Sequence, residues 1–248
     1  QTEMKRYVII ILLSLGYMYS YGQSESGCVG LDKKYGALLE KNRENATFLN
    51  NLLNEYSTTC VHSAVFQQAA VYLHAISPSY LSSIGCGEYY HKANRMSKSL
   101  DFYGKAISFA DDNSKISDIY MRMAEIYFYN LKNFQQAREY AQKSLEIIAN
   151  QAAPYFLLAE LYANSNISND DVTDAAKYWL AADMAENART AEPTASNIER
   201  ANALIAKYSC MFPTAEQIQN NRNMNENTAY RIGGWIGRNT ICRQRKCM

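Results

Sequence analysis

"AEIYFYNLKNFQQAREYAQKSLEII", residues 124–148, contains two apolar patterns separated by a short polar turn. In both halves the apolar residues recur every three or four positions, which is the period of an amphipathic helix. Small residues stand at Ala124, Ala137 and Ala141, with aromatic residues beside them. The stretch predicts a helical hairpin whose two helices approach closely at the alanines.

The spacing of this hairpin returns elsewhere in the chain. Counted from Ser117, small or bulky residues fill positions 4, 7, 8, 11, 20, 24 and 27, if one residue is inserted at the turn. These positions define the two-helix tetratricopeptide repeat. Copies that start at Tyr80 and Ala152 fill them too, the second with an insertion over residues 164–173, and a degenerate copy precedes Tyr80. Four helical pairs exceed the three that repeats need to bury their faces.

The sequence therefore predicts an all-α fold, a solenoid of about four tetratricopeptide-type hairpins with a capping helix and a short C-terminal β-hairpin-like tail. A count of 20 Tyr against 4 Pro and 11 Gly agrees with helices packed through aromatic side chains. The capping helix is expected to begin at Ser196 or Asn197. The predicted division is a signal peptide in 1–22, an N-terminal segment and first helix in 23–45, repeats in 46–192, capping helices in 193–222 and a basic tail in 223–248.

The first residues are interpreted as an export signal. Lys5 and Arg6 precede an apolar run over residues 7–15, and small side chains precede a cleavage site at Gln23. The run is shorter than the roughly 20 apolar residues of a membrane span. We therefore expect a signal peptide over residues 4–22, export to the periplasm or the outer membrane, and no stable membrane span after signal removal. A permanent anchor is the alternative.

Charge is nearly balanced over the whole chain, at +1, but the C-terminus is basic. Five bases follow the last acid: Arg231, Arg238, Arg243, Arg245 and Lys246. A basic tail can favour anionic partners. Because no motif that reads nucleotide bases accompanies these charges, a solvated surface is the favoured interpretation and no nucleic-acid partner is expected.

Six cysteines in an exported chain indicate disulfides. Cys86 and Cys210 lie in apolar helical patterns, which favours buried thiols. Cys28 and Cys60 are predicted to form a disulfide, because a helix over residues 31–42 that runs antiparallel to the next one brings both cysteines to one end. Two free thiols are the alternative for this pair, and a lipid anchor on Cys28 is a further one.

Patterns for catalysis or metal binding are missing from the sequence. His62, His74 and His91 lack the spacing of a zinc site. The oxygen-rich residues 164–171 lack the alternating ligands, central Gly and terminal Glu of an EF-hand loop, so a polar turn is favoured. A Gly-rich phosphate loop, a GxSxG elbow and a paired-carboxylate signature are also lacking. We therefore expect a protein that is not an enzyme and that uses no cofactor or metal.

Four segments carry a family resemblance. The export signal, "LDKKYGALLEKN" at 31–42, the repeat "LKNFQQAREYAQKSLEI" at 131–147 and the ending "YSCMFPTAEQ…YRIGGWI" from 208 to 236 resemble secreted tetratricopeptide repeat proteins of Bacteroidetes bacteria. The resemblance implies a protein-binding scaffold in the periplasm or at the outer membrane. It implies no fixed partner, because the repeat motif specifies a fold better than a function.

The interaction surface is expected on the concave face formed by the first helices of the repeats. Repeat positions 2, 5, 9, 12 and 13 face away from the packing seam. They are occupied by Leu81, Ile84, Glu88, His91, Lys92, Asp118, Met121, Glu125, Phe128, Tyr129, Phe156, Glu160 and Ala163. An apolar floor with glutamates beside it suits a protein or peptide partner with apolar anchors and basic flanks. An outer-membrane assembly component is one candidate partner.

A second functional hypothesis is kept open. It is an accessory protein that binds carbohydrate or another envelope polymer through exposed aromatic side chains, Trp235 among them, and through the basic tail. Binding to a glycan array would favour this hypothesis, and co-purification with outer-membrane proteins would favour the scaffold.

Overall fold

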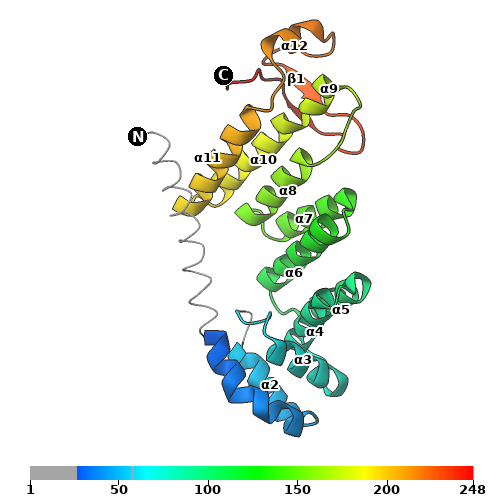
Figure 1. Cartoon of the computed structure of the whole chain (residues 1–248), viewed down its shortest axis with the longest axis vertical. Coiled ribbons are helices and arrows are strands. Elements are labelled where there is room, and N and C mark those ends of the chain that lie inside the picture. Colours follow the sequence, from blue (N-terminus) through cyan, green and yellow to red (C-terminus); the bar gives the residue numbers. More distant parts are fainter. Residues whose placement is uncertain (1–26, 57–58, 248) are drawn as a thin grey trace. The chain divides into compact units, whose positions relative to one another are not determined.

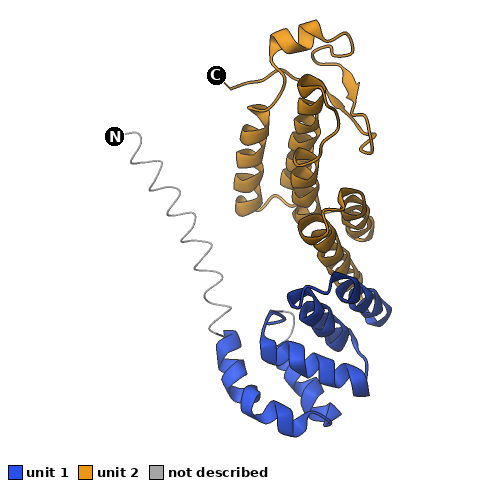
Figure 2. Ribbon diagram, turned by 45° about the vertical axis from the view of Figure 1, so that its right-hand side comes forward, with its two compact units in different colours: residues 1–110 blue, residues 111–248 orange. Residues whose placement is uncertain are grey.

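The computed structural model of the chain describes residues 27–56 and 59–247 (Figure 1). The predicted signal peptide lies outside these residues. The described part is mostly helical with one small two-stranded sheet, which agrees with an all-α fold. Two compact units divide the chain, Gln1–Ala110 and Asp111–Met248 (Figure 2), and each is described by itself.

In the first unit, helices pack against one another in sequence order. A helix over residues 27–39 continues into a 3₁₀ turn. The elements that follow the first helix are η1 (Glu40–Asn42), α2 (Ala46–Tyr56), α3 (Ala64–Ile76), α4 (Tyr80–Lys92) and α5 (Met96–Phe109). Ser63 and Ser79 precede α3 and α4, and each hydroxyl accepts a hydrogen bond from a backbone N–H of the first turn. These caps satisfy donors that the helix itself leaves free.

Close helix approach in this unit depends on two glycines of α4. A Cβ at Gly85 would lie 2.3 Å from the Cβ of Ala70 on α3. A Cβ at Gly87 would lie 2.7 Å from the ring of Tyr103 on α5. Both separations are shorter than real Cβ contacts, so α4 can pack this tightly on both neighbours only without these side chains. Gly87 holds the small position 8 that the repeat pattern assigns to it.

The start of the first helix lies beside the turn between α2 and α3, as the sequence predicts. The Asp32 carboxylate accepts hydrogen bonds from the hydroxyls of Tyr56 and Ser63. A disulfide joins Cys28 to Cys60, which is 32 residues away. The helix begins earlier than the expected residues 31–42, so that Cys28 lies within its first turn.

The second unit consists of helices followed by a C-terminal β-ribbon. Its elements are α6 (Asn113–Glu125), η2 (Ile126–Asn130), α7 (Phe134–Ile147), α8 (Ala152–Ala163), α9 (Asp171–Ala175), α10 (Lys177–Ala191), α11 (Ala195–Ser209), α12 (Ala215–Asn220), β1 (Ala229–Arg231) and β2 (Asn239–Ile241). Thr194 caps α11, because its hydroxyl accepts from the N–H of Asn197. The expected cap at Ser196 or Asn197 is therefore wrong by two or three residues.

α6 and α7 form the hairpin that residues 124–148 predict. Ala124, Ala137 and Ala141 are all fully buried where the two helices cross. The rings of Tyr127 and Tyr140 stack with centroids 5.3 Å apart and planes 7° apart. Small residues at the crossing and aromatic residues beside it therefore have the roles that their spacing predicts.

A π-helical turn absorbs the extra residue of this hairpin. In η2 the N–H of Leu131 donates to the carbonyl of Ile126, five residues back. The turn ends at Lys132, which has a positive φ of 52°. In the hairpin of α4 and α5 the corresponding residue is Asn94, with a φ of 56° and no π-helical turn before it. The inserted residue is therefore accommodated in a wider π-helical turn, and the left-handed backbone conformation of the turn residue is kept.

Enlarging the alanines at the crossing is expected to destabilise the second unit. Ala124→Leu and Ala137→Leu should each lower the free energy of unfolding by about 1 to 3 kcal/mol, because the added carbons have no space between α6 and α7. Gln135→Leu is the matched control, since Gln135 is exposed on the same hairpin. Chemical denaturation followed by far-UV circular dichroism measures the difference. Equal midpoints for the three variants would contradict this packing.

The left-handed residues of the two hairpin turns offer a reciprocal test. Lys132→Asn is expected to stabilise the chain by about 0.5 to 1 kcal/mol, because asparagine tolerates a positive φ better than lysine. Asn94→Lys is expected to destabilise it by a similar amount. Denaturation midpoints of both variants decide the matter, and a shift of both in the same direction would contradict the equivalence of the two turns.

The segment after α12 packs against α10. β1 and β2 pair antiparallel with Tyr230 opposite Thr240, which confirms the predicted β-hairpin. The indole Nε1 of Trp179 donates to the carbonyl of Arg243 (2.6 Å), and Nη2 of Arg243 donates to the carbonyl of Trp179 (2.6 Å). Arg243 also pairs with Asp183 at 2.6 Å. The expectation of a solvated tail is therefore wrong at Arg243, because reciprocal bonds hold this residue on α10.

Two cysteines with similar sequence surroundings differ in the structure. Cys86 is a buried thiol, as predicted, and burial raises its pKa to about 12. Cys210 is not a buried thiol, because it forms a disulfide with Cys247, 37 residues away. The tail returns to the end of α11 and brings the two sulfurs together, which the local sequence around Cys210 does not reveal.

Candidate functional site

The predicted interaction residues divide between the two units. Leu81, Ile84, Glu88, His91 and Lys92 belong to α4 in the first unit, and the other eight belong to α6, η2 and α8 in the second. Four of the thirteen are buried, so the prediction that they line an open groove is wrong for them. These four are Ile84, Glu88, Phe128 and Phe156.

Glu88 is buried, although the sequence predicts it on the interaction surface. Its carboxylate accepts a 2.7 Å hydrogen bond from the hydroxyl of Tyr103 on α5. It also lies 3.1 Å from Nδ1 of His62, in the turn before α3. Partners from two other elements therefore enclose this carboxylate inside the first unit, and it cannot flank a partner.

In the second unit, α8 and α11 both pack against α10 and also contact each other (Figure 1). Four side chains of α11 and one that follows it face the space beside α8: Arg200, Leu204, Lys207, Tyr208 and Met211. Their spacing of three or four residues places them on one helix face. On α8, Phe156, Glu160 and Ala163 have the same helical spacing. We call the space between these two rows the α8–α11 cleft.

One end of the α8–α11 cleft is closed by a charged network. Arg200 pairs with Oε1 of Glu160 at 3.1 Å and covers the ring of Phe156 at 4.2 Å from the centroid. The hydroxyl of Tyr129 donates to Oε2 of the same Glu160 (2.9 Å). Burial and this hydrogen bond raise the pKa of Tyr129, so the phenol stays protonated as a donor. The predicted floor residue Phe156 is therefore covered by α11, and Glu160 already has a cationic partner.

The other end of the cleft is an open cavity with a mixed apolar and polar lining. Glu160, Ala163, Asn164, Tyr178, Leu204, Lys207, Tyr208 and Met211 line a cavity of about 290 Å³. The side chain of Met211 is 45% exposed, and Lys207 lies 5.8 Å from the ring centroid of Tyr208. Burial raises the pKa of Tyr208 to about 12. This end presents the apolar side chains of Ala163, Leu204 and Met211 together with the cation of Lys207.

Sequence reasoning found only one wall of this site. Tyr129, Glu160 and Ala163 were predicted as interaction residues, whereas Lys207 and Met211 were not. The amphipathic pattern of α11 indicated that Leu204 and Tyr208 lie on its apolar face. A signal for the missing residues was available, because Lys207 and Met211 border that face at helical spacing.

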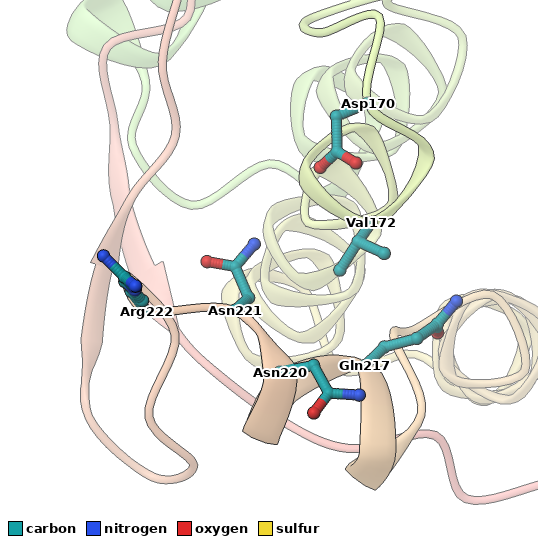
Figure 3. A pocket seen from close by; sticks show the side chains of 6 residues that line it. All are labelled: Asp170, Val172, Gln217, Asn220, Asn221 and Arg222. Atoms are coloured by element: carbon teal, nitrogen blue, oxygen red, sulfur yellow. The ribbon is translucent and has the colours of Figure 1, made fainter.

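A second cavity, of about 540 Å³, lies between α9 and α12 (Figure 3). Asp170 and Val172 line it from the α9 side, and Gln217, Asn220, Asn221 and Arg222 line it from the α12 side. The Asp170 carboxylate caps α9 by accepting from the N–H of Thr173 at the end of the polar segment 164–171. Five of its six lining residues have polar side chains, three of them amides, whereas apolar and polar residues alternate in the lining of the α8–α11 cleft.

Trp235 does not form an open aromatic platform. The guanidinium of Arg138 lies 5.0 Å from its ring centroid, and Tyr162 lies against the same ring at 6.4 Å. Arg138 also donates hydrogen bonds to the carbonyls of Trp235 and Ile236. The expectation of an exposed Trp235 is therefore wrong, because the β-ribbon folds back over α7 and α8.

A histidine–serine contact in the first unit is structural. Nδ1 of His74 lies 3.2 Å from the hydroxyl of Ser82, which is fully buried and takes part in the cap of α4. Burial lowers the pKa of His74.

Within residues 27–56 and 59–247, no cluster of three or more His, Cys, Asp or Glu could hold a metal ion. In the same residues, no helix is long and apolar enough to cross a membrane.

Comparison with known proteins adds no functional assignment. No family model matches this chain, and no curated protein matches it. The functional proposals therefore rest on the α8–α11 cleft and on the cavity between α9 and α12.

Proposed function

We propose that this chain is a non-enzymatic interaction scaffold exported to the bacterial cell envelope, in the periplasm or at the outer membrane. Its helical hairpins, with small residues at the crossings, fit a tetratricopeptide-type solenoid. Its two disulfides are typical of a protein that folds in an oxidising compartment. The sequence resemblance to secreted tetratricopeptide repeat proteins of Bacteroidetes supports the same proposal.

The observation that carries the proposal is the open end of the α8–α11 cleft. Met211 is nearly half exposed and lines this end together with Leu204, Ala163 and two tyrosines. Methionine adapts to differently shaped apolar partners and is frequent on protein-binding surfaces. A cleft of this size accepts one or two side chains of a partner segment rather than a drug-sized cofactor.

Site-specific photocrosslinking tests this function. A photoreactive phenylalanine analogue is placed at Met211 or, as a matched control, at Phe109 of the first unit, which is exposed to nearly the same degree, 45% against 43%. Each protein is irradiated with solubilised native envelope. We expect a discrete crosslinked partner from position 211 and none from position 109, because only Met211 borders the cleft.

Filling the cleft is the second arm of the experiment. Ala163→Phe is expected to abolish the crosslink from position 211 while the far-UV helical signal is kept, since the ring occupies the space between Ala163 and Leu204. A crosslink that persists in the filled variant, or equal crosslinking from both probe positions, would contradict the proposal.

The carbohydrate hypothesis is retained as a second candidate because of the polar cavity in Figure 3. Arg222 and Asn220 line it and have no hydrogen bond or ion pair with other described residues. Amide and guanidinium groups donate to hydroxyl oxygens, as sugars require. Glycan-array binding that disappears in Arg222→Ala and survives Met211→Ala would support this candidate over the scaffold. Substitution of Trp235 is not a suitable test, because it would disturb the packing of Trp235 against Arg138 and Tyr162.

A further inference from the structure

We propose that the α8–α11 cleft recognises a peptide segment that presents a bulky apolar side chain next to a carboxylate. This inference rests on the proposed scaffold function and specifies the chemistry of the partner. It reverses the basic flanks that the sequence predicts for the partner. The reversal follows from the charges that the structure leaves unpaired at the cleft.

Two of the three glutamates expected to attract a basic partner, Glu88 and Glu160, are already engaged by other residues of the chain. Glu88 is enclosed in the first unit by Tyr103 and His62. Glu160 lines the cleft, but Arg200 pairs with one carboxylate oxygen and Tyr129 donates to the other. A basic side chain entering the cleft would have to compete with Arg200 for a carboxylate whose two oxygens are already engaged.

Lys207 is the remaining charged side chain of the α8–α11 cleft. It lines the open end of the cleft and forms no ion pair with any residue of the described chain. The charged side chains with which α8 and α11 border the cleft are Glu160, Arg200 and Lys207, and their sum is one positive charge. An incoming carboxylate is therefore complementary to the cleft, whereas an incoming ammonium group faces Lys207 without a counter-charge.

The apolar part of the motif follows from the neighbours of Lys207. Tyr208 is the next residue, and Leu204 and Met211 lie one helical turn before and after. A carboxylate held by Lys207 thus places the adjacent partner side chains over these apolar groups. From Arg200 to Met211 the row extends about 16 Å, which accommodates about five residues of an extended segment. The motif is therefore short, with its carboxylate and apolar anchor adjacent or two positions apart.

Peptide selection with a charge-reversed variant tests this inference. A library of random 12-residue peptides displayed on phage is selected on the wild-type protein, on Lys207→Glu and on Lys33→Glu. Lys33 is the matched control, since it is an exposed helical lysine of the first unit. We expect wild type and Lys33→Glu to select an apolar residue beside Asp or Glu, and Lys207→Glu to select the same apolar residue beside Lys or Arg.

The possible results distinguish a failure of the scaffold function from a failure of the proposed peptide motif. Selection of no common sequence by the wild-type protein would overturn the scaffold function and the inference with it. A common apolar motif that lacks an acidic residue, or one that is unchanged in Lys207→Glu, would overturn the inference and leave the scaffold function standing. A motif whose recovery does not depend on the open cleft, tested with Ala163→Phe, would also overturn the inference.

A synthetic peptide with the selected motif gives the magnitude. Lys207→Met keeps most of the aliphatic stem and removes the charge, so we expect binding to weaken by about threefold to tenfold, as for a solvent-accessible charge-assisted contact. The loss should shrink in high salt. Affinity equal to wild type at low salt would overturn the assignment of Lys207 to the carboxylate.

Discussion

Trp179→Ala is expected to lower the free energy of unfolding of the second unit by about 3 to 5 kcal/mol. The indole is fully buried and meets the rings of Phe212 and Tyr230 edge-on, at 6.4 and 5.4 Å between centroids. Truncation would leave a cavity among these rings. It would also remove the donor for the carbonyl of Arg243, which a buried acceptor tolerates poorly.

Two comparisons make this prediction specific. Trp179→Phe keeps much of the ring volume and loses the N–H donor, so its cost should be about 1 to 2 kcal/mol. Trp235→Ala should cost less than Trp179→Ala, because Trp235 is only partly buried. Hydrogen exchange read by mass spectrometry is expected to show lost protection in α10 and in residues 228–245. Equal costs for Trp179→Ala and Trp235→Ala would contradict the central position of Trp179.

Removal of the Cys28–Cys60 disulfide is expected to destabilise the first unit by about 3 to 4 kcal/mol. In the chain-entropy model the size of the closed loop sets this value, and the two cysteines are 32 residues apart. The bond ties the first helix to the turn between α2 and α3, beside the point where Asp32 of that helix accepts hydrogen bonds from Tyr56 and Ser63. Without this bond, the first helix is held on the degenerate first repeat only by noncovalent contacts.

The double variant Cys28→Ser/Cys60→Ser, compared with the wild type under non-reducing conditions, measures this effect by denaturation. Peptide mapping without reductant should recover the two cysteines of the wild type as one linked species. Hydrogen exchange should rise in residues 27–39 and in α2 and remain unchanged in α10, which belongs to the other unit. Separate alkylated peptides from the wild type, or an unchanged midpoint for the double variant, would contradict the prediction.

Part of the candidate site follows from local sequence and part does not. Tyr129, Glu160 and Ala163 were predicted because repeat positions follow from helical periodicity, and the periodicity of one hairpin is contained in its own residues. Lys207 and Met211 border the cleft because α11 returns alongside α8. Which side of α11 meets α8 depends on how both helices pack on α10, and that packing joins residues about 40 positions apart.

Local sequence was sufficient to predict the helices, the close crossing of α6 and α7, the β-ribbon and the Cys28–Cys60 pair. These features depend on periodicity, on small residues at the crossing, on a glycine-containing turn and on the antiparallel neighbour of the first helix. Contacts between distant elements produce the burial of Glu88, the Cys210–Cys247 bond, the attachment of Arg243 to α10 and the pairing of Glu160 with Arg200. The exposure and charge environment of a side chain depend on whichever distant element covers it, and no local pattern encodes that partner.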